Sequence, residues 1–143
     1  MKAGSTDVFV VDASAALAWC FKDERSDSSQ ALLARCETEV MHVPALWFLE
    51  CGNILLNAER HRRLTHQQIQ DNLALLNSLD PKVDDAAAVL TFGRIYDLAR
   101  RHKLTVYDAA YLELAKRLAV PLATRDDDLK RAAREAGVEL IDA

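Results

Sequence analysis

The stretch VFVVDASA, residues 8–15, opens with the apolar run Val8–Val11 and turns polar at Asp12. A short run that is apolar without interruption is typical of a strand buried on both faces of a parallel sheet. Three further β-type runs follow, at Val40–Val43 (VMHV), Val120–Ala123 (VPLA) and Val138–Ile141 (VELI). We therefore expect a parallel sheet in which Asp12 ends the first strand.

Helical patterns fill the gaps between the expected strands. The expected helices are Ala13–Phe21, Ser26–Glu39, Leu46–Arg60, Thr65–Leu79, Asp85–His102, Thr105–Leu118 and Asp126–Ala136. Thr65 and Gln68 have the spacing of a capping box, and Gly137 follows the last helix, where glycine is favoured. Strands separated by helices predict an α/β fold, with a parallel sheet covered on both faces. In such sheets the ligand crevice lies at the carboxyl ends of the strands.

The composition fits one globular domain over residues 1–143, with 50% hydrophobic residues and a formal net charge of −4. Met1–Asp7 has no apolar run of the kind found in signal peptides, and no later stretch approaches a membrane span. We therefore expect a cytoplasmic protein without a membrane partner. Cys20, Cys36 and Cys51 lack the number and spacing of a disulfide framework or a zinc site, so each is expected to be buried.

Two aspartates are expected on the same rim of the sheet. Asp12 ends the first strand and Asp126 follows the third, in VPLATRDDDL, and parallel strands share a carboxyl edge. Helix capping is the alternative for both residues, because acidic side chains favour a helix N-terminus. Taken one at a time, each aspartate is open to both interpretations.

A third aspartate, Asp108, lies in TVYDAAYLELAKRLA. We assign the polar face of this helix to Glu113, Lys116 and Arg117, and Asp108 lies about 140° around the helix from Glu113. Asp108 is therefore expected to point away from solvent, where a carboxylate needs a partner or a metal ion. The alternative is a second capping box, with Thr105 as N-cap and Asp108 at the third helical position.

Glu50 belongs to a polar stripe on LWFLECGNILLNAER that also contains Asn53, Asn57 and Arg60. The alternative to a functional role is that this stripe is the solvent-exposed face of an amphipathic helix. Three or four acids, without a histidine or cysteine pattern, suit Mg²⁺ better than zinc, because Mg²⁺ prefers oxygen ligands and keeps several waters. Such a site can activate water and screen the charge of a phosphodiester.

Four segments, in chain order, resemble the PIN-domain family and in particular the VapC toxins of bacterial toxin–antitoxin pairs. They are VVDASAALAW, VPALWFLECGNIL, LTVYDAAYLELA and PLATRDDDLKRAA. The resemblance covers nearly the whole chain. It implies a three-layer sandwich, with a parallel sheet of four to five strands and helices on both faces.

The resemblance also implies an acidic site. By position its carboxylates fall on Asp12, Glu50, Asp108 and Asp126. Asp12 and Asp108 correspond to the direct metal ligands, for Mg²⁺ or for Mn²⁺ as a substitute, and the other two complete the pocket or hold a second ion. Ser14, Asn53 and Thr124 match polar residues that support the site, and Asp128 is the stand-in for Asp126.

The activity implied by the resemblance is a Mg²⁺-dependent endoribonuclease toxin that hydrolyses RNA. The implied partners are a VapB-type antitoxin and a second copy of the chain in a homodimer. Arg125 is the cation expected nearest the substrate, and the aromatic candidates for partner contacts are Trp19, Trp47, Phe48 and Phe92.

Three other functions compete with this interpretation. The first is a PIN nuclease of RNA processing that has no antitoxin, and the second is a non-catalytic PIN module that only binds a partner. The third is a haloacid-dehalogenase-like phosphatase, which needs a second aspartate two residues after Asp12, where this chain has Ser14. Cleavage and phosphatase assays discriminate among them.

Overall fold

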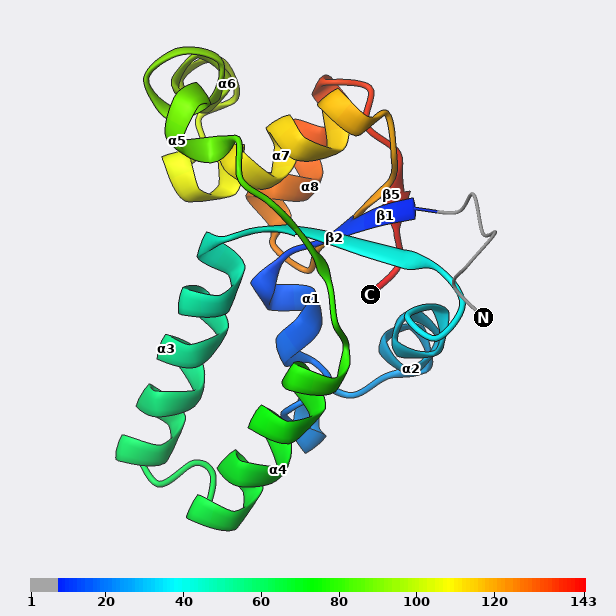
Figure 1. The fold of residues 1–143 in the computed structure, drawn as a ribbon, viewed down its shortest axis with the longest axis vertical. Coiled ribbons are helices and arrows are strands. Elements are labelled where there is room, and N and C mark those ends of the chain that lie inside the picture. The colour runs from blue at the N-terminus through cyan, green and yellow to red at the C-terminus, as the bar shows by residue number, and fades with distance from the viewer. Residues whose placement is uncertain (1–7) are drawn as a thin grey trace.

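Five parallel strands form one sheet in the order β3-β2-β1-β4-β5, in a computed structural model that describes residues 8–143 (Figure 1). The strands are β1 (Val8–Val11), β2 (Val40–Pro44), β3 (Lys82–Asp84), β4 (Leu122–Ala123) and β5 (Leu140–Ile141). The expected parallel α/β fold is confirmed. Residues 1–7, where the sequence predicts no signal peptide, lie outside the described residues.

The first strand is the centre of the sheet. In β1, Phe9, Val10 and Val11 are fully buried, as the apolar run predicts for a strand covered on both faces. Val10 pairs with His42 of β2 on one side and with Leu122 of β4 on the other. The segment after β1 therefore lies beside two neighbouring strand ends.

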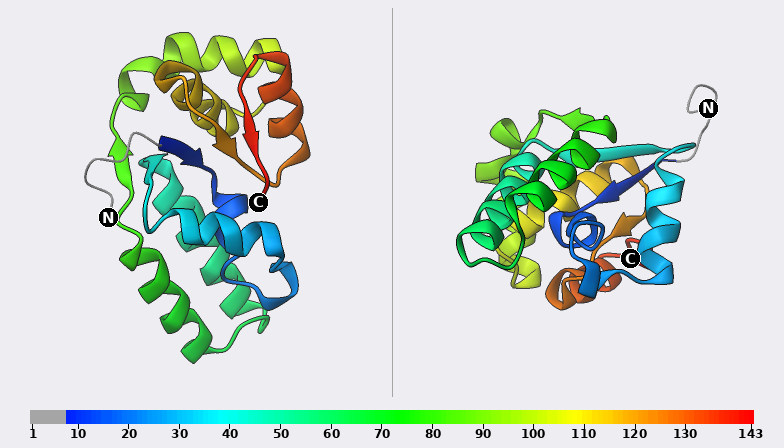
Figure 2. Two further views of the ribbon diagram at one scale, coloured as in Figure 1. Left: turned by 90° about the vertical axis from the view of Figure 1, so that its right-hand side faces the viewer. Right: turned by 90° about the horizontal axis from the view of Figure 1, so that it is seen from below.

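Helices cover both faces of this sheet (Figures 1 and 2). The helical elements are α1 (Ala13–Leu17), η1 (Lys22–Glu24), α2 (Asp27–Arg35), α3 (Leu46–Arg60), α4 (His66–Ser78), α5 (Ala87–Leu90), η2 (Thr91–Ile95), α6 (Tyr96–His102), α7 (Val106–Leu118) and α8 (Asp127–Glu135). The helices α1 to α4 lie on one side of the sheet, whereas α5 to α8 lie on the other. This arrangement is the expected three-layer sandwich.

Several local predictions are confirmed at the level of single side chains. Thr65 and Gln68 form the expected capping box at the start of α4. Gly137 has a φ of 76° after α8, a left-handed conformation that favours glycine. The buried cysteines, Cys20, Cys36 and Cys51, are free thiols, as expected.

Several elements differ from the expected ones in their bounds or regularity. The helix expected from Asp85 to His102 is interrupted by the π-helical turn η2, which contains Gly93, and the helix expected over Ala13–Phe21 ends at Leu17. The third strand, β3, was not expected, because Lys82 and Val83 are exposed at the sheet edge and give no apolar run. The strands expected at Val120–Ala123 and Val138–Ile141 are two residues long rather than four.

Trp19 and Trp47 are each 1% exposed, so neither is available for the partner contacts suggested by the sequence. Phe48 and Phe92 are 45% and 95% exposed. Among the described residues, no helix is both long enough and apolar enough to cross a membrane.

Candidate active site

The carboxyl ends of β1 and β4 place their following residues side by side. Val11 pairs with Ala123, and the Asp12 amide donates to the Ala123 carbonyl at 3.1 Å. The next residues on the two strands are therefore Asp12 and Thr124, which meet at the rim that the sequence predicts for ligand binding.

Asp12 is held by three hydrogen-bond donors although it is only 3% exposed. The Ala15 amide donates to Oδ1 at 2.9 Å, and the hydroxyls of Ser14 and Thr124 donate to the carboxylate at 2.8 and 2.5 Å. Burial raises the pKa of Asp12 to about 6, against the lowering effect of these three bonds. Asp12 thus caps α1 and also presents an anchored carboxyl group at the rim.

Thr124 links Asp12 to Asp126. The Asp126 amide donates to the Thr124 hydroxyl oxygen at 3.1 Å, while the same hydroxyl donates to Asp12. Asp126 is the N-cap of α8, because its Oδ1 accepts from the Leu129 amide at 2.8 Å. Helix capping therefore holds for both rim aspartates, and it fixes their backbones at the shared edge.

Asp108 lies in the first turn of α7, where the hydroxyl of Thr105 accepts from its amide at 3.0 Å. No reciprocal bond from the Asp108 carboxylate to the Thr105 amide forms in this described segment, so the capping box is incomplete. Burial raises the pKa of Asp108 to about 6, and repulsion from Asp126, Asp12 and Glu50 adds to this rise. The four predicted carboxylates therefore share one electrostatic environment.

Glu50, on α3, is held by a residue that the sequence reasoning missed. The hydroxyl of Tyr111 donates to Glu50 Oε1 at 2.5 Å, and Tyr111 is 1% exposed. Burial raises the pKa of Glu50 and the bond from Tyr111 lowers it. Tyr111 follows Asp108 by three positions on α7, a spacing that places two side chains on one helix face. That spacing is the sequence feature that could have identified Tyr111 as part of the site.

Other predicted residues lie apart from this cluster. Asn53 is exposed on α3 and forms no hydrogen bond to the four acids in the described structure. The side chain of Asp128 is 76% exposed, with its carboxylate 4.0 Å from Arg131. The guanidinium of Arg125, expected nearest the substrate, donates instead to the Glu24 carbonyl at 2.7 Å.

The polar face assigned to α7 is wrong in one respect, because Glu113 is 1% exposed. Its carboxylate accepts from Nε of Arg117 at 3.0 Å and lies 3.5 Å from Arg94. Arg117 also donates to Asp84 at 2.8 Å. An amphipathic pattern cannot reveal this, because long basic side chains can cover a buried acid.

The donor chemistry of the rim fits a hard cation. Asp12, Glu50, Asp108 and Asp126 supply only oxygen atoms, and the raised pKa values of Asp12 and Asp108 mean that a cation would favour their ionised forms. Within residues 8–143, no group of three or more histidine, cysteine or acidic side chains is arranged to hold a metal ion directly. Oxygen atoms are the ligands that Mg²⁺ prefers.

Comparisons with known proteins agree with this architecture. The PIN domain family matches residues 9–135. A curated relative, Ribonuclease VapC3 of Pyrobaculum aerophilum, is 35% identical over 122 residues, which cover 84% of this chain and 90% of the relative.

Solved structures of similar fold include toxin–antitoxin proteins. VapBC2 from Rickettsia felis, crystallised on a DNA fragment from its promoter, has a TM-score of 0.66 and 14% identity, covering 94% of this chain and 98% of that one. VapC20 of Mycobacterium tuberculosis, a toxin that cleaves the sarcin–ricin loop, has a TM-score of 0.62 and 21% identity, covering 87% and 94%. At these identities the likeness concerns the fold.

Proposed function

Since the chain belongs to the PIN domain family, we propose that it is a Mg²⁺-dependent endoribonuclease of the VapC type, cleaving RNA at the rim of Asp12, Glu50, Asp108 and Asp126. Its 35% identity to a named ribonuclease, over most of both chains, supports the reaction class. The observation that carries the proposal is the convergence of acids from distant segments: Thr124 joins Asp12 to Asp126 by hydrogen bonds, and Asp12, Asp126 and Glu50 all lie close enough to Asp108 to help raise its pKa.

The acidic residues have different roles in the proposed reaction. Asp12 is anchored by its three donors, which would hold its carboxylate in a fixed orientation toward a cation. Asp108 has fewer bonds, and its pKa is raised by burial and then by repulsion from its acidic neighbours, so Asp108 and Asp12 would together hold the cation, whose charge would offset that repulsion. When bound, Mg²⁺ would supply charge to screen the phosphodiester and to activate water.

Glu50 and Asp126 would orient water beside the cation or hold a second ion. Tyr111 fixes the carboxylate of Glu50 through its short hydrogen bond. Asp126 uses Oδ1 to cap α8, and its Oδ2 accepts no hydrogen bond from residues 8–143. That second oxygen is the one free to act on a bound water.

Cleavage of RNA by the purified chain, with Mg²⁺ or Mn²⁺ and with EDTA, tests this proposal. Asp12→Asn and Asp108→Asn should abolish metal-dependent cleavage. Asp127→Asn is the matched control, because Asp127 is exposed and belongs to the same loop–helix junction as Asp126. Cleavage that survives EDTA, or that survives in both site variants, would refute the acidic site.

The proposed partners are a small antitoxin of the VapB type and a second copy of the chain. Support comes from the relative's VapC name and from complexes such as VapBC2 among the similar folds. Co-expression with a candidate antitoxin should give a co-purifying complex in which RNA cleavage is inhibited. Light scattering of the isolated chain should give the mass of a dimer, and a monomer at micromolar concentration would contradict that part.

A further inference from the structure

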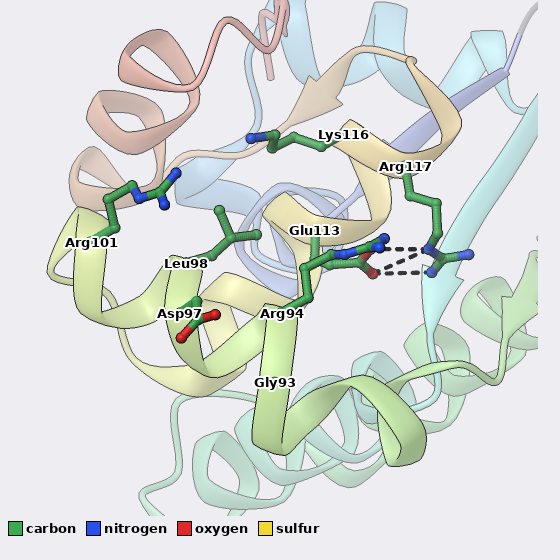
Figure 3. Close-up of a pocket in the computed structure, with 8 residues that line it drawn as sticks. All are labelled: Gly93, Arg94, Asp97, Leu98, Arg101, Glu113, Lys116 and Arg117. Atoms are coloured by element: carbon green, nitrogen blue, oxygen red, sulfur yellow. Dashed lines mark hydrogen bonds and ion pairs between the residues drawn. The ribbon is translucent and has the colours of Figure 1, made fainter.

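A second charged feature uses the later turns of α7, whereas Asp108 of the acidic rim lies in the first turn. It is an open cleft of about 540 Å³ between η2, α6 and α7 (Figure 3). Its charged lining residues are Arg94, Asp97, Arg101, Glu113, Lys116 and Arg117. Four cations and two acids thus share the cleft, although the chain as a whole carries a net charge of −4.

The acid at the base of this cleft is already compensated. Glu113 accepts from Arg117 and lies 3.5 Å from Arg94, so its charge faces two guanidinium groups. Arg117 is also engaged by Asp84. These contacts take up most of the charge of Arg117 and part of that of Arg94, whose side chain is 59% exposed.

The remaining two cations have no ion-pair partner among the described residues. Arg101 and Lys116 form no ion pair or hydrogen bond with any of the described side chains. They extend toward each other across the cleft from α6 and α7, as Figure 3 shows. Asp97 is the one further acid that lines the cleft, and it forms no ion pair within residues 8–143. Converging like charges repel, and an anion between them would remove that repulsion.

The position of the cleft relates it to the acidic rim. Asp108 and Lys116 belong to the same helix, and at 1.5 Å per residue they are about 12 Å apart along its axis. A nucleic-acid strand held at Asp108 could therefore reach the cleft within a few nucleotides. The four acids repel phosphates, so a strand bound there needs compensating cations nearby.

We propose that this cleft is an exosite that binds a backbone phosphate of the RNA substrate away from the cleaved bond. The guanidinium of Arg101 offers paired donors to phosphate oxygens, and the ammonium of Lys116 acts as a point charge. Arg94 also lines the cleft, with its guanidinium turned toward Glu113. The inference rests on the proposed ribonuclease function, and it names where part of the substrate's charge is bound.

The test measures how RNA binding depends on salt. The probe is a fluorescein-labelled single-stranded RNA oligonucleotide, titrated with the intact protein in EDTA at several KCl concentrations. Each lost phosphate contact should reduce the slope of log K against log salt by about 0.7 for a single strand. Arg101→Gln/Lys116→Gln removes the one proposed phosphate contact, so it should lower the slope by about 0.7 and weaken binding at low salt.

A second double variant, Arg100→Gln/Arg134→Gln, controls for net charge. Both of its residues are exposed, lie outside the cleft and form no ion pair in the described part of the chain. The exosite predicts a clearly smaller change in slope for this control. Equal changes in the two variants, or no change in the cleft variant, would overturn the exosite.

The same proteins separate failure of the exosite from failure of the ribonuclease. Metal-dependent cleavage by the wild type, with equal RNA binding by all variants, would leave the nuclease standing and remove the exosite. No RNA binding and no cleavage by the wild type would overturn both. Stronger competition by a polyglutamate peptide than by unlabelled RNA would assign the cleft to an acidic protein segment and would also overturn the proposal.

Discussion

Replacing Asp12 by asparagine should stabilise the metal-free protein at neutral pH. Asp12 is 3% exposed and its pKa is about 6, against 3.8 for the unperturbed group. A rise of about two pKa units corresponds to about 3 kcal/mol. The free energy of unfolding falls by this amount when the Asp12 carboxyl ionises inside the folded protein. Asparagine keeps an oxygen for the Ala15 amide and carries no charge, so the variant should recover up to about 3 kcal/mol.

The pH dependence follows from the same two values. In the wild type, the stability contributed by the protonated Asp12 carboxyl is fully present below the unfolded pKa of 3.8. That stability is lost as the pH rises through the folded pKa of about 6. The advantage of Asp12→Asn should therefore be largest above pH 7 and shrink to a small fraction by pH 4.

Urea unfolding of both proteins in EDTA, at pH 7.5 and at pH 4, measures this difference. Asp127→Asn is the control, because its carboxylate is exposed and its replacement should change stability little at either pH. An Asp12→Asn variant that is less stable at pH 7.5, or whose advantage is the same at both pH values, would refute the reasoning. In that case, the hydrogen bonds from Ser14 and Thr124 outweigh the cost of burial.

Tyr111→Phe removes the hydroxyl that holds Glu50, so RNA cleavage should slow while urea unfolding shows a loss of only about 1 kcal/mol; unchanged cleavage would separate Tyr111 from the site. Mg²⁺ at about 100 times its Kd should stabilise the wild type by about 2.7 kcal/mol in thermal melts, and Asp108→Asn should lose this gain. Gly137→Ala places a Cβ in open space at φ 76°, so the backbone strain alone should cost about 1–2 kcal/mol in urea; an unaltered midpoint would contradict this.

The strand ends are the part of the site that local pattern predicts well. An apolar run followed by Asp12, and VPLAT followed by Arg125 and Asp126, place two acids on one edge, because parallel strands share it. Glu50 and Asp108, unlike the two strand-end aspartates, cannot be assigned to the site from local pattern alone. Each lies on a helix whose polar residues also fit ordinary capping or solvation, so the family resemblance was needed to single them out.

Other features depend on tertiary contacts that no local pattern contains. Glu113 is buried because Arg94 and Arg117 reach it from two elements. The strand β3 is held by pairing of its backbone with β2, whatever its side chains. The π-helical turn η2 breaks a periodic pattern that continues on both sides of it.

The insertion of β4 beside β1 has a consequence for the timing of synthesis. The Thr124 hydroxyl that anchors Asp12 is separated from it by 112 positions in the chain. At translation rates of about 5–20 residues per second, that interval lasts roughly 6 to 20 seconds. Throughout it, one edge of β1 has no partner strand, and a nascent chain cannot complete the rim. A product released early from the ribosome would carry Asp12, Glu50 and Asp108 without the segment that organises them, and should be inert toward RNA.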